Sequence, residues 1–255
     1  MTMRLSETAI NAAFESHAAR YARDKLWSIP YHIKCWEYAC DAFEGSYESA
    51  FGKLYDELRT RWQVFRSQNY NAQTAEKIQQ IMAVLPAELS IRRLSEFAEP
   101  TQVMLDQLWH AITTAGDIKM NKNGPSLVAL TKFLHFWNPR LFVIADREVV
   151  WNWVLRHRWL WAQIEHVRGE IDAVLSPAVK EHRYYSTELS KYLAVLVWGG
   201  QVLRDNPSVC SAFASYVELQ YKKPVDLNLQ EYEGAALEWL LLGLVELPPA
   251  GLTIA

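Results

Sequence analysis

Residues 126–150 read SLVALTKFLHFWNPRLFVIADREVV, a pattern that predicts two helices joined by a short extended connection. Apolar residues recur every three or four positions over 127–137, the spacing of a helix with one wide buried face. Asn138-Pro139 ends this helix, because proline cannot donate to a helical ladder and disfavours helix in the residue before it. Residues 141–144 are too few for a core helix and suit a buried extended connection.

Asp146 stands where the second helix, predicted over residues 147–155, would begin. Aspartate is a favoured N-cap residue, because its carboxylate accepts hydrogen bonds from the free N–H groups of the first turn and suits the helix dipole. Capping without any further function is the ordinary interpretation of such a residue. A catalytic carboxylate at a helix start is compatible with the same geometry.

The order of small hairpin, helix, proline-containing turn, apolar run, aspartate and helix resembles the core of the helix-hairpin-helix DNA glycosylase superfamily, in particular its 8-oxoguanine glycosylase branch. On that pattern Asn123-Gly124-Pro125-Ser126 falls on the hairpin and Asp146 on the catalytic aspartate. The resemblance implies DNA as partner and cleavage of the N-glycosidic bond of an extruded base. A carboxylate assists this reaction by stabilising the cationic sugar or by orienting water.

Two positions depart from the family pattern. The family hairpin carries two glycines flanking one residue, whereas this chain has Gly124 followed by Pro125, which has no N–H to offer a phosphate. The position of the Schiff-base lysine of bifunctional members is Leu127, which excludes amine catalysis there. The resemblance therefore implies monofunctional hydrolysis by water, if the protein is catalytic.

Basic and aromatic side chains around Asp146 form the predicted substrate-binding set. Loop lysines can meet phosphates, although solvated lysines are the ordinary alternative. On the helix that follows the hairpin, a core-edge histidine bonded to the backbone is the ordinary alternative to a ligand contact. Trp153, His157 and Trp161 share a helical stripe that could hold a flipped base, with core packing as the alternative. The predicted set is Lys119, Lys122, Asn123, Gly124, Lys132, His135, Arg147, Trp153 and His157.

Composition predicts a compact all-α protein: half of the 255 residues are apolar, 11 are Trp, and no solenoid period is present. We expect a two-lobed multi-helix globule with a degenerate helix-hairpin-helix core. The chain is interpreted as one helical domain over 1–255, or as two lobes formed by 1–100 with 186–255 and by 101–185.

Charge, cysteines and motifs limit the classes of function. With a net charge of −3 and a pI near 6.2, the chain lacks the excess of basic residues that is usual in nucleic-acid-binding domains. Three cysteines without a CxxC pair indicate buried thiols in a reducing cytoplasm, and no apolar run is long enough to span a membrane. We expect no metal and no cofactor, because no ligand set or nucleotide-binding motif occurs.

A second hypothesis is that the protein has the same fold but does not catalyse base removal. The acidic balance and the altered hairpin favour a non-catalytic helical module that binds a protein or a nucleic acid, for example in a bacterial stress or phage-defence system. A sealed carboxylate at Asp146 would favour this module, and an open pocket with a basic rim would favour the glycosylase.

Overall fold

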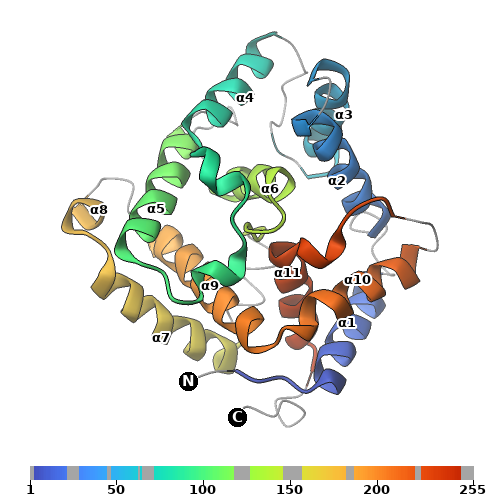
Figure 1. Ribbon diagram of the computed structural model, residues 1–255, viewed down its shortest axis with the longest axis vertical. Coiled ribbons are helices and arrows are strands. Elements are labelled where there is room, and N and C mark those ends of the chain that lie inside the picture. Colours follow the sequence, from blue (N-terminus) through green and yellow to red (C-terminus); the bar gives the residue numbers. More distant parts are fainter. Residues whose placement is uncertain are drawn as a thin grey trace.

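The computed structural model describes residues 3–21, 29–44, 47–62, 64, 72–117, 127–145, 157–181, 187–221 and 225–247. Within these ranges the chain is all-α, as predicted, and contains no β-strand (Figure 1). The α-helices are α1 (Glu7–Tyr21), α2 (Ile29–Glu44), α3 (Tyr47–Thr60), α4 (Ala72–Val84), α5 (Gln102–Asp117), α6 (Leu127–Trp137), α7 (Arg158–Val174), α8 (Pro177–Glu181), α9 (Thr187–Asp205), α10 (Ser208–Tyr221) and α11 (Glu233–Leu244). Short 3-10 helices span Ala87–Ser90 (η2), Leu94–Ala98 (η3) and Leu229–Glu231 (η5).

Helix α6 has the bounds that the apolar spacing predicts and lies near the centre of the molecule (Figure 1). It is buried from Ala129 to Phe136. The helix closes where Asn138 donates its backbone N–H to Leu134 O at 2.8 Å, and Pro139 follows. The predicted end of the helix at Asn138-Pro139 is therefore confirmed.

Helices α9 and α11 form the middle of the core. Every residue of α11 is buried, and so are most residues of α9. A helix that is apolar on all sides needs neighbours all round it. Helices α1, α9 and α10 pack against α11, while α7 and η3 pack against α9 (Figure 1).

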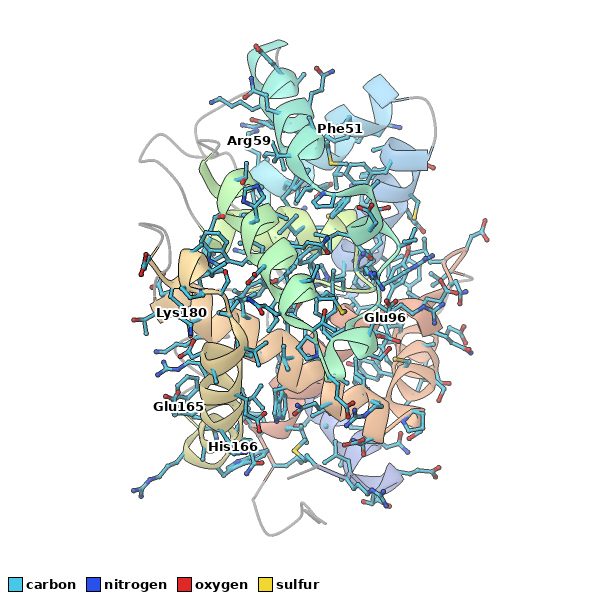
Figure 2. All side chains as sticks on the ribbon, turned by 60° about the vertical axis from the view of Figure 1, so that its left-hand side comes forward. Phe51, Arg59, Glu96, Glu165, His166 and Lys180 are labelled. Carbon is cyan, nitrogen blue, oxygen red and sulfur yellow. The ribbon has the colours of Figure 1, made fainter. Side chains whose placement is uncertain are left out.

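Helix α7 illustrates the outer layer. Its buried residues Leu160, Ile164, Val167 and Ile171 follow the three-and-four spacing of one helical stripe, which faces α9. Figure 2 shows Glu165 and His166 on the outer side of the same helix. One side of α7 thus joins the core and the other meets solvent.

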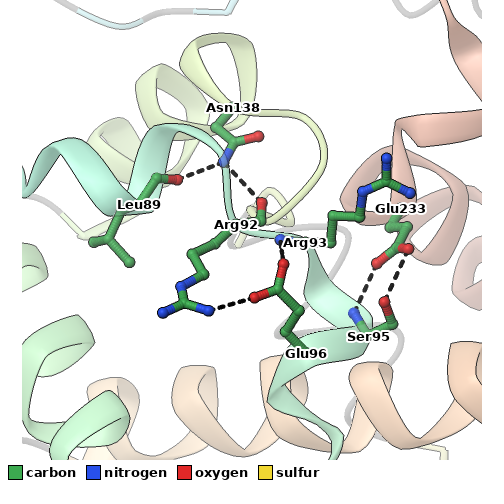
Figure 3. Close-up of polar contacts among 7 residues, drawn as sticks. All are labelled: Leu89, Arg92, Arg93, Ser95, Glu96, Asn138 and Glu233. Atoms are coloured by element: carbon green, nitrogen blue, oxygen red, sulfur yellow. Dashed lines mark hydrogen bonds and ion pairs between the residues drawn. The ribbon is translucent and has the colours of Figure 1, made fainter.

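Residues 87–98 form the 3-10 helices η2 and η3 and not one α-helix. The side chain of Asn138 binds two backbone carbonyls that a continuous helix would use. Its amide Nδ2 donates to Leu89 O at 2.6 Å and to Arg92 O at 3.1 Å (Figure 3). Leu94 N then donates to Arg140 O at 3.0 Å, which binds η3 to the turn after α6.

Other predictions differ in detail or stay open. After helix α3, the chain turns back with a bond from Val64 N to Leu58 O at 2.9 Å. The cysteines form no disulfide; Cys35 is buried as expected, whereas Cys40 and Cys210 are half-buried. The helix predicted over 147–155 lies outside the described residues, and the division into two lobes stays a prediction.

Candidate functional site

The segment Leu141, Phe142, Val143, Ile144 and Ala145, here called the connecting segment, follows α6 and leads to residue 146. All five residues are at most 1% exposed, and the segment forms no helix or strand. Buried backbone N–H and C=O groups need hydrogen-bond partners, and this segment has no ladder to supply them. Its partners must therefore come from other elements.

Four buried side chains from three helices provide these partners, one for each residue from Phe142 to Ala145. We call them the backbone cradle. The contacts are His135 Nδ1 with Phe142 O at 2.8 Å, Tyr192 Oη to Val143 O at 2.9 Å, Ile144 N to Glu238 Oε2 at 3.3 Å, and Ala145 N to Thr131 Oγ1 at 3.0 Å. Helices α6, α9 and α11 thus hold the backbone directly before Asp146.

Thr131 holds the last residue of the connecting segment. Its hydroxyl donates to Val128 O at 3.2 Å within α6 and accepts from Ala145 N at 3.0 Å. A threonine hydroxyl has one proton to donate, so the bond to Val128 leaves its lone pairs directed at Ala145. The hydroxyl therefore has one orientation that serves both partners.

His135 is fully buried, and burial lowers its pKa to about 4. The imidazole is therefore neutral at neutral pH, and its Nδ1 carries the proton that Phe142 O accepts. Glu238 Oε2 lies 3.6 Å from the same nitrogen, a contact that becomes an ion pair only when the ring is protonated. Within the described residues, His135 Nε2 has no hydrogen-bond partner.

Aromatic rings explain why the surroundings of His135 are apolar. The ring centroids of Phe136 and Trp36 lie 5.1 and 5.9 Å from that of His135, and His32 lies 6.5 Å away. Burial also raises the pKa of the Tyr192 hydroxyl above its usual range, with the Glu238 carboxylate as a smaller cause. Tyr192 therefore keeps its proton and acts as a donor to Val143 O.

Helix α11 approaches the turn after α6 so closely that only glycine fits at its first turn. A Cβ atom at Gly234 would lie 2.5 Å from Phe142 O and 2.9 Å from Pro139 O. Real Cβ atoms avoid such distances, and the atoms in conflict belong to backbone. The next residue, Ala235, donates its N–H to Pro139 O at 3.2 Å. This contact joins α11 directly to the segment that the cradle holds.

The structure places Lys132 and His135 together in the core. Lys132 is 5% exposed, and its Nζ donates to Trp62 O at 3.1 Å, just beyond the end of α3. A cation there suits the negative end of the helix dipole. His157 is half-buried immediately before α7, and its side chain makes no capping hydrogen bond.

The other predicted site residues lie outside the described residues. Substrate contact by any member of the predicted set stays a prediction. The residues outside the described ranges are Asp146, Lys119, Lys122, Asn123, Gly124, Arg147 and Trp153.

Three cradle residues were not among the predicted site residues. Thr131 and Glu238 are polar residues within largely apolar helical runs, LVALTKFLHFW and EGAALEWLLLGL, and that interruption is a signal in the sequence. Tyr192 offers no such signal, because tyrosine is common in helical cores. Its role depends on a contact between residues 49 positions apart.

Comparison with known proteins found no similar protein: no family model, no curated protein and no solved structure matches the chain. Among the residues that the structure describes, no group of three His, Cys, Asp or Glu side chains is arranged to hold a metal ion. The same part of the chain has no helix with the length and apolar character needed to cross a membrane.

Proposed function

We propose that the chain is a DNA-glycosylase-like protein that recognises an extruded or modified base, with Asp146 as its acidic residue. The observation that supports this proposal most directly is the backbone cradle. Four buried side chains bind the four residues that precede Asp146, so the chain enters this position from a fixed backbone. Catalytic groups need positions held by packing and by supporting hydrogen bonds.

The proposed reaction is hydrolysis of the N-glycosidic bond, assisted by the Asp146 carboxylate and without a Schiff-base lysine. The bond between the sugar C1′ and the base nitrogen breaks, and its electron pair leaves with the base, which then gains a proton. Positive charge develops on the sugar, and the Asp146 carboxylate stabilises it and orients the water whose oxygen bonds to C1′. Because Leu127 occupies the family's lysine position, the product is an abasic site in an intact strand.

The test is base release from duplexes that carry modified bases, comparing the unaltered protein with Asp146→Asn. We expect release by the unaltered protein and a loss of at least a hundredfold in Asp146→Asn, with an unchanged far-UV circular dichroism spectrum. Asp226→Asn is the matched control, because Asp226 is exposed and lies far along the chain. Strand cleavage should appear only after alkali treatment. Release by Asp146→Asn at the unaltered rate would remove this carboxylate from the reaction.

A non-catalytic binding module is the second candidate. It is favoured by Lys132 and His135, two predicted ligand contacts that are instead buried and bonded to backbone carbonyls. Fluorescence anisotropy with the same duplexes separates the two functions. Saturable binding without base release supports the module and contradicts the glycosylase.

A further inference from the structure

A groove with a volume of about 400 Å³ runs between α1 and α10, and no residue of the backbone cradle lines it. The two helices run in the same direction, since Leu5 N donates to Asn206 Oδ1 before both helices begin and Phe14 stacks on Tyr216 further along. The ring centroids of Phe14 and Tyr216 are 5.5 Å apart. This volume is within the usual range for sites that hold small molecules.

The floor of the groove is apolar and its α1 wall carries two carboxylates. Ile10, Phe14 and Tyr216 are buried at the floor. Glu7 and Glu15 line the wall eight residues apart, which places them roughly 12 Å apart along the helix axis. Within the described residues neither carboxylate has an ion pair or hydrogen bond, and no Lys or Arg lines the groove.

The α10 wall supplies hydroxyl groups opposite these carboxylates. Ser208, Ser211 and Ser215 line this side, spaced by three and four residues on one face of the helix. Ser211 donates to Ser208 O at 2.9 Å, which leaves its lone pairs available to a donor in the groove. The groove therefore offers acceptors on both walls above an apolar and aromatic floor.

We propose that this groove binds a linear aliphatic polyamine of the length of spermidine. The terminal ammonium groups would meet Glu7 and Glu15, the methylene chain would lie over Ile10 and Phe14, and the inner amine would face the serine hydroxyls. Two acidic ends fit a ligand with two separated cationic ends, and the apolar floor suits the methylene groups between them. A shorter diamine such as putrescine cannot reach both carboxylates. This site is independent of the proposed reaction at Asp146.

The test is isothermal titration of spermidine into the full chain, free of nucleic acid, at low and at physiological ionic strength. We expect one saturable site, with putrescine bound at least threefold more weakly. Glu7→Gln and Glu15→Gln should each weaken the spermidine Kd by about two- to fivefold, the range of exposed ion pairs. The variant that carries both Glu7→Gln and Glu15→Gln should bind spermidine and putrescine with similar Kd values.

Glu218→Gln is the matched control, because Glu218 is an exposed carboxylate on α10 that does not line the groove. It should leave the Kd unchanged, and circular dichroism should show that every variant is folded. Three outcomes would overturn the site: no saturable heat, equal affinity for putrescine and spermidine, or equal weakening by Glu218→Gln and by the groove variants.

Discussion

The hydroxyl of Thr131 accepts the backbone N–H of Ala145 at 3.0 Å, in a part of the core where both residues are closed to solvent. This bond joins the middle of α6 to the last described residue before Asp146. The two residues are 14 positions apart, so the bond closes the loop made by the end of α6 and the connecting segment. The backbone directly before Asp146 therefore depends on a polar side chain from the middle of α6.

Thr131→Val should destabilise the protein and disturb the site. Valine keeps the shape of threonine but leaves the Ala145 N–H buried without an acceptor, which costs about 1–3 kcal/mol of unfolding free energy. Urea denaturation measures this loss. Thr131→Ser keeps the hydroxyl and should lose less stability and retain any base release. Equal stability of the Val variant and the unaltered protein would mean that the bond to Ala145 contributes nothing.

The free energy of unfolding should decrease as the pH is lowered from 6.5 to 4, because of the buried imidazole of His135. Burial lowers the folded-state pKa from its ordinary 6.5 to about 4. The unfolded chain therefore binds a proton in this window while the folded chain does not. The contribution of His135 is fully present above pH 6.5, is lost as the pH falls towards 4, and changes no further below. Its slope reaches about 1.4 kcal/mol per pH unit.

His135→Asn tests this dependence, because the asparagine amide can replace Nδ1 as a donor to Phe142 O but does not titrate. Unfolding free energies measured from pH 4 to 7 should show a shallower slope for the variant. His17, His32 and Glu238 remain in both proteins, so the difference in slope belongs to position 135. His166→Gln is the control on the exposed face of α7 and should keep the original slope. Identical slopes for His135→Asn and the unaltered protein would contradict the neutral, buried imidazole.

Asn138→Asp should strongly destabilise the protein. The amide donates to Leu89 O and Arg92 O (Figure 3). Its Oδ1 accepts from Arg140 N. Aspartate loses both donors and places a carboxylate against two carbonyls. We expect a loss of roughly 3 kcal/mol or more in unfolding free energy.

Asn228→Asp is the control for this change, because Asn228 is exposed and its side chain makes no capping bond. It should change the unfolding free energy by less than about 0.5 kcal/mol. Thermal unfolding of both variants at pH 7 compares them directly. A mild effect of Asn138→Asp, similar to that of the control, would mean that the η2–η3 region does not depend on this amide.

Gly234→Ala should destabilise the contact between α11 and the connecting segment. Alanine is the better helix former by about 1 kcal/mol, but its Cβ would conflict with Phe142 O and Pro139 O, which are backbone atoms. Gly169→Ala is the matched helical control, since a Cβ there meets nothing within 4 Å. We expect Gly169→Ala to raise the melting temperature and Gly234→Ala to lower it. A rise in both variants would contradict the close approach.

Parts of the fold could be predicted because their signals are local. The bounds of α6 follow from three-and-four spacing, and its end follows from Asn138-Pro139. The 3-10 helices at 87–98 could not be predicted, because their cause is a side chain at position 138 that binds carbonyls 46 and 49 residues earlier. Local propensity contains no information about such a partner.

In the candidate site, too, the features that could be predicted are local in the sequence, and the others depend on distant contacts. From the sequence alone, the all-α class and the buried connecting segment could be determined, because each depends on neighbours within a few positions. The role of Asp146 stays a prediction. Only the tertiary structure decided that Tyr192 and Glu238 hold this segment, at separations of 49 and 94 residues. It also decided that Lys132 and His135 face inward. The physical reason is that a buried backbone without a ladder must take its hydrogen bonds from whichever side chains the packed helices bring to it.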